Sequence, residues 1–295
     1  MKGFLFIVAA CLLWAVDTLI RYPLLFSGPS AQRIVFTEHL LLVLFLLPIA
    51  WKSRATFWRA QVSHLFWFFI IGAIGSAYAT LAFTKAFSLI NPSLVILLQK
   101  LQPLVAIGLA HVLLGERIRA SFLFWALLAL FGAFLISSPD ILPGLQNVSL
   151  ISDNALYGYG LTLFAVIAWG SSTVFGKKLS GVGYDETQIM FGRFFAGLLA
   201  LIPLFSIIGI ELDFDLTINS KILAMVVISG LAGMWLYYMG LKRVSARVSA
   251  LAEMFFPLCA VAINWIFLGK ALEPVQILGA ALLILASTMI QLLKL

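Results

Sequence analysis

The sequence predicts an all-α polytopic membrane protein, with ten transmembrane helices arranged as two inverted five-helix repeats. Of the 295 residues, 63% are hydrophobic and only 11% are charged, whereas soluble domains are about 25% charged. Ten apolar segments approach the roughly 20 residues that a helix needs to cross a bilayer. The chain also resembles itself at a fixed offset, which indicates an internal duplication.

The expected spans alternate with short polar connections. The first apolar run is too long for a signal peptide, and no small-residue cleavage site follows it. Residues 140–155 are polar and contain proline, so they are expected to link a first unit, 1–139, to a second unit, 156–295. The expected spans are residues 3–22, 32–51, 65–87, 92–114, 120–138, 156–176, 186–208, 222–241, 247–268 and 274–293.

The duplication bears on topology as well as on fold. Five spans per copy is an odd number, so the second copy must enter the bilayer upside down relative to the first. Inverted repeats of this kind are typical of secondary transporters. The matching positions lie 154 or 155 residues apart: Trp14 with Trp169, Phe36 with Phe191, Pro48 with Pro203, Pro103 with Pro257 and Gly115 with Gly269.

The distribution of basic residues predicts the orientation, because cytoplasmic loops are enriched in Lys and Arg. Both termini are expected in the cytoplasm, with the protein in the cell (inner) membrane. The net charge of +7 does not indicate nucleic-acid binding, since the basic residues lie in short loops between apolar spans. With the N-terminus inside, 12 of the 19 basic residues are cytoplasmic: Lys2, Lys52, Arg54, Arg59, Arg117, Arg119, Lys177, Lys178, Lys242, Arg243, Arg247 and Lys294.

Neither a cofactor nor a metal site is expected. Cys11 and Cys259 lie inside apolar segments and are typical small core residues, and the three histidines lack metal-ligand spacing. The chain has no G-x-x-x-x-G-K-[ST] phosphate loop, so an ATPase is not built in. It also has no G-x-S-x-G motif, no H-E-x-x-H motif and no paired intramembrane aspartates, which argues against an enzyme.

Polar groups inside the spans are the best candidate site residues, since a charge in the bilayer core costs about 2.5 kcal/mol or more. Glu253, Pro257 and Asn264 share one face of the ninth span, and Gln99 precedes Pro103 on the matching face of the fourth. Each proline frees the carbonyl four residues before it, which belongs to Gln99 or Glu253. These faces either line a substrate pathway or belong to kinked packing helices.

Lys100 lies one residue from that face. It either supplies a positive charge for a substrate carboxylate or pairs with Glu253 as a structural bridge. An amino-acid zwitterion would satisfy Lys100 and Glu253 together, which favours that substrate class. Glu253 is also the best candidate proton carrier, since a buried carboxyl can exchange a proton near neutral pH.

Aromatic residues supply the next candidates. Trp14 and Trp169 lie near the middle of the first and sixth spans, where pathway lining or core packing is more typical than an interfacial belt. Asp17, on the face of Trp14, is either a gate residue or an acid near the outer mouth. Tyr78 and Tyr237 are candidate pathway residues, because buried tyrosines seek hydrogen-bond partners.

Glu38 and Arg193 occupy equivalent positions in the second and seventh spans but carry opposite charges. They form either a bridge that locks one transport state or two separate pairs within the bundle. Together with Glu253 they are the candidate coupling and gating residues. Gly72 and Gly75, in the third span, favour close helix packing.

The five-plus-five pattern, with Pro-centred fourth and ninth spans that end in LLGERI and FLGKAL, resembles the EamA-type transporters of the drug/metabolite transporter superfamily. The resemblance covers the whole chain. Residues 114–116 match the Leu-Gly-Glu that closes the family's fourth helix, and Arg193 matches an Arg of its seventh. Lys270 and Glu38 depart from the family at the equivalent positions of the other copies. The resemblance implies transport of small metabolites, often export of amino acids, although uptake systems, nucleotide-sugar exchangers and drug exporters also belong to it.

These observations predict a secondary active transporter of small polar metabolites that works by alternating access, with an exporter of amino acids or related zwitterions as the first choice. The alternatives are a choline or quaternary-amine transporter, which aromatic walls suit through cation–π attraction, a drug transporter and a lipid flippase. The expected partners are the small-molecule substrate, the lipid bilayer and, as a candidate coupling ion, the proton. Nucleic acid is not expected, and the chain is expected to be a monomer or a homodimer.

Overall fold

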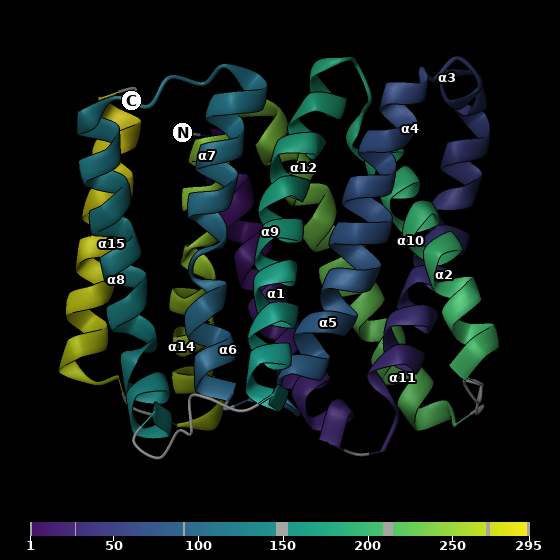
Figure 1. Ribbon diagram of the computed structural model, residues 1–295. Helices are drawn as coiled ribbons and strands as arrows, with labels where there is room; N and C mark the ends of the chain where they lie inside the picture. The colour runs from purple at the N-terminus through teal and green to yellow at the C-terminus, as the bar shows by residue number, and fades with distance from the viewer. Residues whose placement is uncertain are drawn as a thin grey trace.

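The computed structural model describes residues 2–26, 28–90, 92–145, 153–208, 215–269 and 272–293, and their regular structure is entirely helical. Ten stretches of helix within them are long and apolar enough to cross a membrane. They run side by side between two ends of one bundle (Figure 1). We call the end that carries both termini the terminal end, and the opposite end the far end.

Helix bounds in the first half follow the expected order of spans. A short helix, α3, connects the second span to the third. The elements are α1 (Lys2–Phe26), α2 (Ala31–Lys52), α3 (Arg54–Trp58), α4 (Val62–Phe69), η1 (Ile70–Tyr78), α5 (Ala79–Ala86), α6 (Pro92–Gln99), α7 (Gln102–Leu114) and α8 (Ala120–Leu145).

The described elements of the second half follow a similar order, without a counterpart of α3. Two of its spans are again assembled from successive helical pieces. The elements are α9 (Asp153–Gly181), α10 (Glu186–Ile208), α11 (Leu216–Met225), η2 (Val226–Gly233), α12 (Met234–Arg243), α13 (Ala246–Glu253), α14 (Phe255–Leu268) and α15 (Pro274–Leu292).

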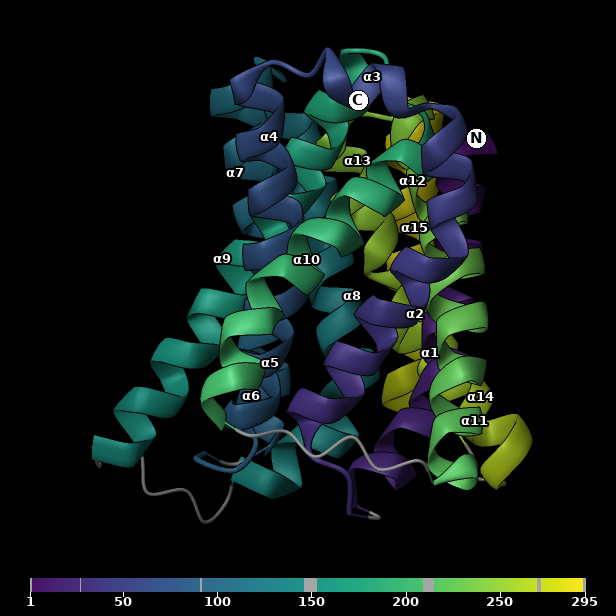
Figure 2. The ribbon, with the colours of Figure 1, turned by 90° about the vertical axis from the view of Figure 1, so that its right-hand side faces the viewer.

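The helices pack in two groups around a shared centre. Helices α8 and α15 form a pair at one side of the bundle, and α10 lies against α2 and η1 at the other side (Figures 1 and 2). Between them, α1 packs against α12 and α14, and α9 packs against α5 and α7. The centre is therefore surrounded by α1, α7, α9, α12 and α13.

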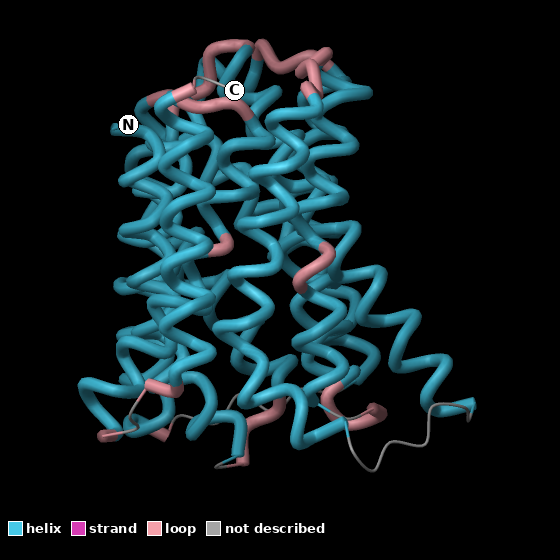
Figure 3. Tube along the Cα trace, turned by 90° about the vertical axis from the view of Figure 1, so that its left-hand side faces the viewer, coloured by secondary structure: helices cyan, strands magenta, loops and turns pink. Residues whose placement is uncertain are grey.

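The fourth and ninth spans are interrupted at mid-height, visible as short non-helical segments in Figure 3. The sequence predicted kinked but continuous helices there, and the structure corrects this. Helix α6 ends at Gln99 and α7 begins at Gln102, and α13 ends at Glu253 just before α14. The prolines at 103 and 257 lack the N–H that a continuous helix needs, and the backbone instead makes tighter i→i+3 bonds, such as the one from Met254 N to Leu251 O at 3.2 Å.

The third and eighth spans each contain a π-helical segment, η1 and η2, which the sequence did not predict. The close packing expected of the glycines in the third span is present. A Cβ atom on Gly72 would lie 2.2 Å from the Arg193 carbonyl oxygen, and one on Gly75 would lie 1.8 Å from Ser172 Oγ. Residues with side chains cannot occupy these positions without moving α10 or α9 away.

The helix α8 extends to Leu145, although the sequence predicted that the polar connection starts at residue 140. Pro139 frees the carbonyl of Leu135, and the Ser138 hydroxyl donates to that carbonyl at 2.8 Å, so the helix continues through the proline. Of the predicted linker, residues 146–152 lie outside the described residues. Helix α1 is likewise longer than the expected span and includes Arg21.

Candidate functional site

Glu253 lies at the centre of the bundle, where the interruption between α13 and α14 exposes the end of α13. Its carboxylate accepts hydrogen bonds from four side chains on four helices. Oε1 accepts from Tyr237 Oη at 3.0 Å, from Thr173 Oγ1 at 3.2 Å and from Ser249 Oγ at 3.5 Å. Oε2 accepts from Gln102 Nε2 at 3.0 Å. Donors from α7, α9, α12 and α13 thus meet at one acid.

An aromatic pair borders this acid. The rings of Trp14 and Tyr237 lie 5.5 Å apart between centroids at an angle of 47°, and Tyr237 also contacts Tyr238 at 5.3 Å. Gly233 permits the approach of Trp14, since a Cβ there would lie 2.9 Å from the indole Nε1. The site therefore combines a flat apolar wall with a hydrogen-bonded carboxylate.

The carbonyl that Pro257 frees has a partner. The Cys11 thiol of α1 lies 3.7 Å from the carbonyl oxygens of both Ala252 and Glu253. The freed Glu253 carbonyl is thus satisfied by α1 and is tied into the core. Cys11 is a buried packing residue here, as its apolar surroundings predicted.

Arg193 does not pair with Glu38. Of the two interpretations of these equivalent positions, the structure agrees with separate partners and not with a bridge. The guanidinium donates to Tyr238 Oη at 3.2 Å and to the Gly75 carbonyl at 3.5 Å. Its Nε atom is buried and has no hydrogen-bond partner in the part of the chain that the structure describes. Arg193 is therefore a cation held by neutral groups, next to the tyrosines of the central site.

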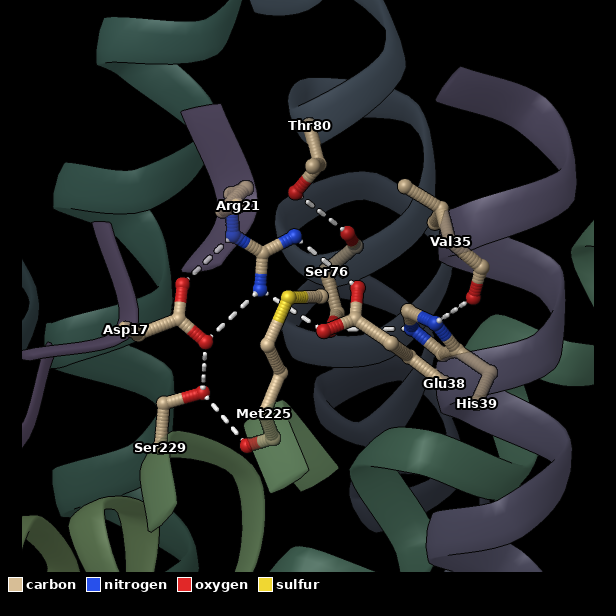
Figure 4. A network of polar contacts seen from close by, with 9 residues as sticks. All are labelled: Asp17, Arg21, Val35, Glu38, His39, Ser76, Thr80, Met225 and Ser229. Carbon is tan, nitrogen blue, oxygen red and sulfur yellow. Dashed lines mark hydrogen bonds and ion pairs between the residues drawn. The ribbon is translucent and has the colours of Figure 1, made fainter. Parts of the chain in front are cut away.

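Glu38 instead belongs to an ionic cluster in the far half of the bundle (Figure 4). Arg21 donates from Nε to Asp17 Oδ2 at 2.6 Å and from Nη2 and Nη1 to Glu38 at 2.7 and 3.0 Å. The Ser229 hydroxyl lies 2.7 Å from Asp17 Oδ1. This cluster links α1, α2 and η2, so the predicted gate residue Asp17 is a buried, paired acid.

The remaining predicted site residues lie elsewhere. Trp169 packs against Phe83 at 4.9 Å, and Tyr78 donates to the Ala200 carbonyl at 3.0 Å. Gln99 ends α6, and Lys100 follows it in the interruption. The predicted bridge from Lys100 to Glu253 is absent from the ion pairs of the described residues. The side chain of Asn264 lies outside the described part of the structure.

Four residues of these networks were missed from the sequence. They are Arg21, Gln102, Thr173 and Ser249. Arg21 was not singled out because it lies at the end of the expected span 3–22, whereas α1 continues to Phe26. Gln102 was overlooked because helical periodicity favoured Gln99, and the break at residues 100–101 changes which side chains face Glu253. Ser249 was detectable, since it precedes Glu253 by one helical turn.

A second acid joins the two halves at the terminal end. Glu116 accepts from the backbone N–H groups of Ala246 at 2.7 Å and Arg247 at 3.1 Å, and so it caps the start of α13. Gly115 before it ends α7 with a φ of 67°, a left-handed conformation that suits glycine. The Leu-Gly-Glu motif therefore anchors the ninth span to the fourth.

No group of three or more His, Cys, Asp or Glu side chains that could hold a metal ion occurs among the described residues. The functional side chains are acids, amides, hydroxyls and aromatic rings, which suit binding of an organic molecule by stacking and hydrogen bonds. The two networks lie at different depths along the bundle and share helix α1.

Comparisons with known proteins agree with this fold. The model of the EamA-like transporter family matches residues 1–138 and 156–292. A relative from Fusobacterium nucleatum subsp. nucleatum, described as the riboflavin transporter ImpX, is 33% identical over 97% of this chain and 96% of its own. A solved crystal structure with 16% sequence identity superposes with a TM-score of 0.78 over 99% of this chain and 96% of its own, which supports the fold.

Proposed function

Since this chain belongs to the EamA-like transporter family and is therefore a multi-pass membrane transporter of small molecules, we propose that its substrate is riboflavin or a close flavin analogue. The relative described as a riboflavin transporter shares a third of its residues across nearly the full length of both chains. The observation that carries the proposal is that an aromatic pair and a hydrogen-bonded acid meet at the centre of the bundle.

The chemistry of the central site suits a flavin. The isoalloxazine ring of riboflavin is flat and aromatic, and one of its edges carries an imide N–H between two carbonyls. Stacking on Trp14 would contribute about 1–3 kcal/mol, by analogy with nucleobases. The Glu253 carboxylate is an acceptor for the imide N–H, and the Gln102 amide is a donor for a flanking carbonyl. The ribityl hydroxyls would find partners among Thr173 and Ser249.

The amino-acid substrate expected from the sequence fits less well. That prediction depended on Lys100 and Glu253 meeting one zwitterion. In the structure Glu253 is surrounded by neutral donors, and Lys100 makes no ion pair with it within the described residues. Quaternary amines remain compatible with the Trp14–Tyr237 pair through cation–π attraction, so both classes serve as competitors in the test below.

The transport cycle that we propose is alternating access around this central site. The ionic cluster of Asp17, Arg21 and Glu38 closes the far half, and the Glu116 cap closes the terminal half. In this proposal the protein lies in the cell (inner) membrane. Its terminal end faces the cytoplasm, because the basic loops lie at that end. The two halves would exchange closed and open states as inverted units.

Transport of riboflavin into proteoliposomes tests the proposal. Full-length protein should accumulate labelled riboflavin faster than protein-free liposomes, and unlabelled riboflavin should compete. A panel of amino acids and choline should leave the rate unchanged. If choline or an amino acid competes and riboflavin does not, the proposal is wrong in its substrate. A variant with Glu253→Ala should lose transport, because the central acceptor is removed.

A further inference from the structure

The far ionic cluster contains more negative than positive charge. Two carboxylates, Asp17 and Glu38, share the single guanidinium of Arg21, with ion-pair distances of 2.6 and 2.7 Å. Asp17 is 4% exposed and Glu38 is 9% exposed. With both acids ionised, the cluster carries one uncompensated negative charge within a membrane-spanning bundle. A buried charge of this kind is costly unless a cation or a proton neutralises it.

Neighbouring charges do not supply the missing positive charge. Only Arg21 lies within ion-pair distance of Glu38 among the residues that the structure describes. Several other ionisable side chains lie on α2 itself or on the helices packed against it. They are His39 and Arg33 on α2, Asp17 and Arg21 on α1, Lys85 on α5, Arg193 and Glu186 on α10 and Lys221 on α11.

His39 is held by neutral groups. Its Nδ1 lies 2.8 Å from the Val35 carbonyl, which can only accept, so Nδ1 carries a hydrogen. Its Nε2 lies 3.0 Å from the Ser76 hydroxyl, which can donate to it. A neutral imidazole satisfies both contacts (Figure 4). The histidine therefore has no structural need for a second proton.

The two acids differ in the donors that they receive. Asp17 accepts from Arg21 Nε at 2.6 Å and Nη2 at 3.2 Å, and the Ser229 hydroxyl is a third donor at 2.7 Å. Ser229 also lies 2.9 Å from the Met225 carbonyl, but a hydrogen bond to an ionised acid is the stronger one. Within the described residues, the Glu38 carboxylate accepts hydrogen bonds from Arg21 alone. The excess charge is therefore least stabilised on Glu38.

We propose that Glu38 is the site that binds the coupling proton, and that its protonation opens the far half of the bundle. The proton passes from water at the far end to a carboxylate oxygen of Glu38. Neutral Glu38 loses its ionic attraction to Arg21, which keeps Asp17 as its partner. The link between α2 and α1 is thereby released. This inference deepens the proposed transport function by naming its coupling site.

The cluster is only partly enclosed, because the Arg21 side chain is 26% exposed. Glu253, in contrast, contacts four neutral side chains and, among the described residues, does not share a guanidinium with a second acid. The proposal thus transfers the proton-carrying role from Glu253 to Glu38.

Infrared difference spectroscopy tests this without any substrate. Full-length protein in nanodiscs is taken from about pH 8 to about pH 5, a range that lies above the ordinary carboxyl pKa values. The wild type should show a protonated-carboxyl band that grows as the pH falls. Glu38→Gln should remove this band, whereas Glu253→Gln and His39→Gln should retain it. Glutamine keeps an acceptor for Arg21, and thermal unfolding confirms that each variant is folded.

Asp17→Asn is the most specific variant for this test, because it removes the like charge beside Glu38. The band should persist but should appear at a lower pH than in the wild type, since Arg21 then belongs to Glu38 alone. The inference is overturned if the band is absent from the wild type, survives in Glu38→Gln, or vanishes in Asp17→Asn. A band whose size depends on Na⁺ at constant pH would also overturn it, by showing that a metal cation neutralises the cluster.

The same variants separate this inference from the proposed substrate. If riboflavin is not transported, the infrared experiment still tests the protonation of Glu38, because it uses no substrate. If riboflavin is transported, an inward-directed gradient of about one pH unit should raise the steady-state accumulation by the wild type up to about tenfold and should leave the accumulation by Glu38→Gln unchanged.

Discussion

Removal of the Trp14 ring is the perturbation that most sharply probes the central site. Trp14 lies against Tyr237, with ring centroids 5.5 Å apart. A flat ligand between two rings needs about 7 Å, which is twice the carbon–carbon contact distance of roughly 3.5 Å. In the proposed site, a flavin would therefore stack on one face of this pair and would not enter between the rings. One stacking contact contributes about 1–3 kcal/mol.

Trp14→Ala should therefore weaken riboflavin binding by about 5- to 140-fold, because each 1.4 kcal/mol corresponds to about tenfold in Kd. Isothermal titration of the full-length protein in nanodiscs measures this change. Trp14→Phe keeps an aromatic face and should have a smaller effect.

Trp125→Ala is the matched control. Trp125 lies on α8 and packs beside Phe124, and the four donors to Glu253 come from other helices. Both alanine variants remove an indole from the bundle, but only Trp14→Ala should weaken binding. Equal riboflavin affinities for the wild type and Trp14→Ala, or equal losses in Trp14→Ala and Trp125→Ala, would refute the assignment of the aromatic wall.

Three further predictions concern stability, measured by thermal unfolding in detergent. Glu116→Ala should lower the stability by about 1–2 kcal/mol, since two backbone N–H groups at the start of α13 lose their cap; an unchanged Tm would contradict this. Gly72→Ala should lower the free energy of unfolding by about 1–3 kcal/mol, because the added Cβ atom would overlap the Arg193 carbonyl. Gly108→Ala should be tolerated, because a Cβ atom at residue 108 has no neighbour within 4 Å. The backbone N–H groups of Ile218 and Thr217 lower the pKa of Asp215. Ionised Asp215 therefore stabilises the folded protein fully above about pH 4, and this stabilisation is lost as the pH falls through the lowered pKa. Asp215→Ala should abolish this pH-dependent loss of stability.

Much of the fold could be predicted from the sequence, because apolar length and the position of basic loops are direct physical requirements of a bilayer. The ten stretches of membrane-spanning helix agree with this prediction. The π-helical segments η1 and η2 could not be predicted, since no local residue preference distinguishes a π turn from an α turn in an apolar helix. The continuation of α8 through Pro139 depended on one hydroxyl, that of Ser138.

The site was predictable in part. Trp14, Tyr237 and Glu253 were singled out from the sequence, and the structure brings them together. Gln102 was missed because the break before it shifts the phase of the helix. The pairing of Glu38 was also missed, since pseudo-symmetry pointed to Arg193, whereas Arg21 lies closer in space and can form two hydrogen bonds to the same carboxylate.

Flavin emission measures the central claim most directly. Riboflavin is fluorescent, and stacking on a tryptophan or tyrosine quenches that emission. Titration of full-length protein into riboflavin should produce saturable quenching with one site per chain, and Trp14→Ala should reduce the quenching at saturation as well as the affinity. Saturable binding with unquenched emission, or the absence of binding to the folded wild type, would contradict a flavin site at Trp14, Tyr237 and Glu253.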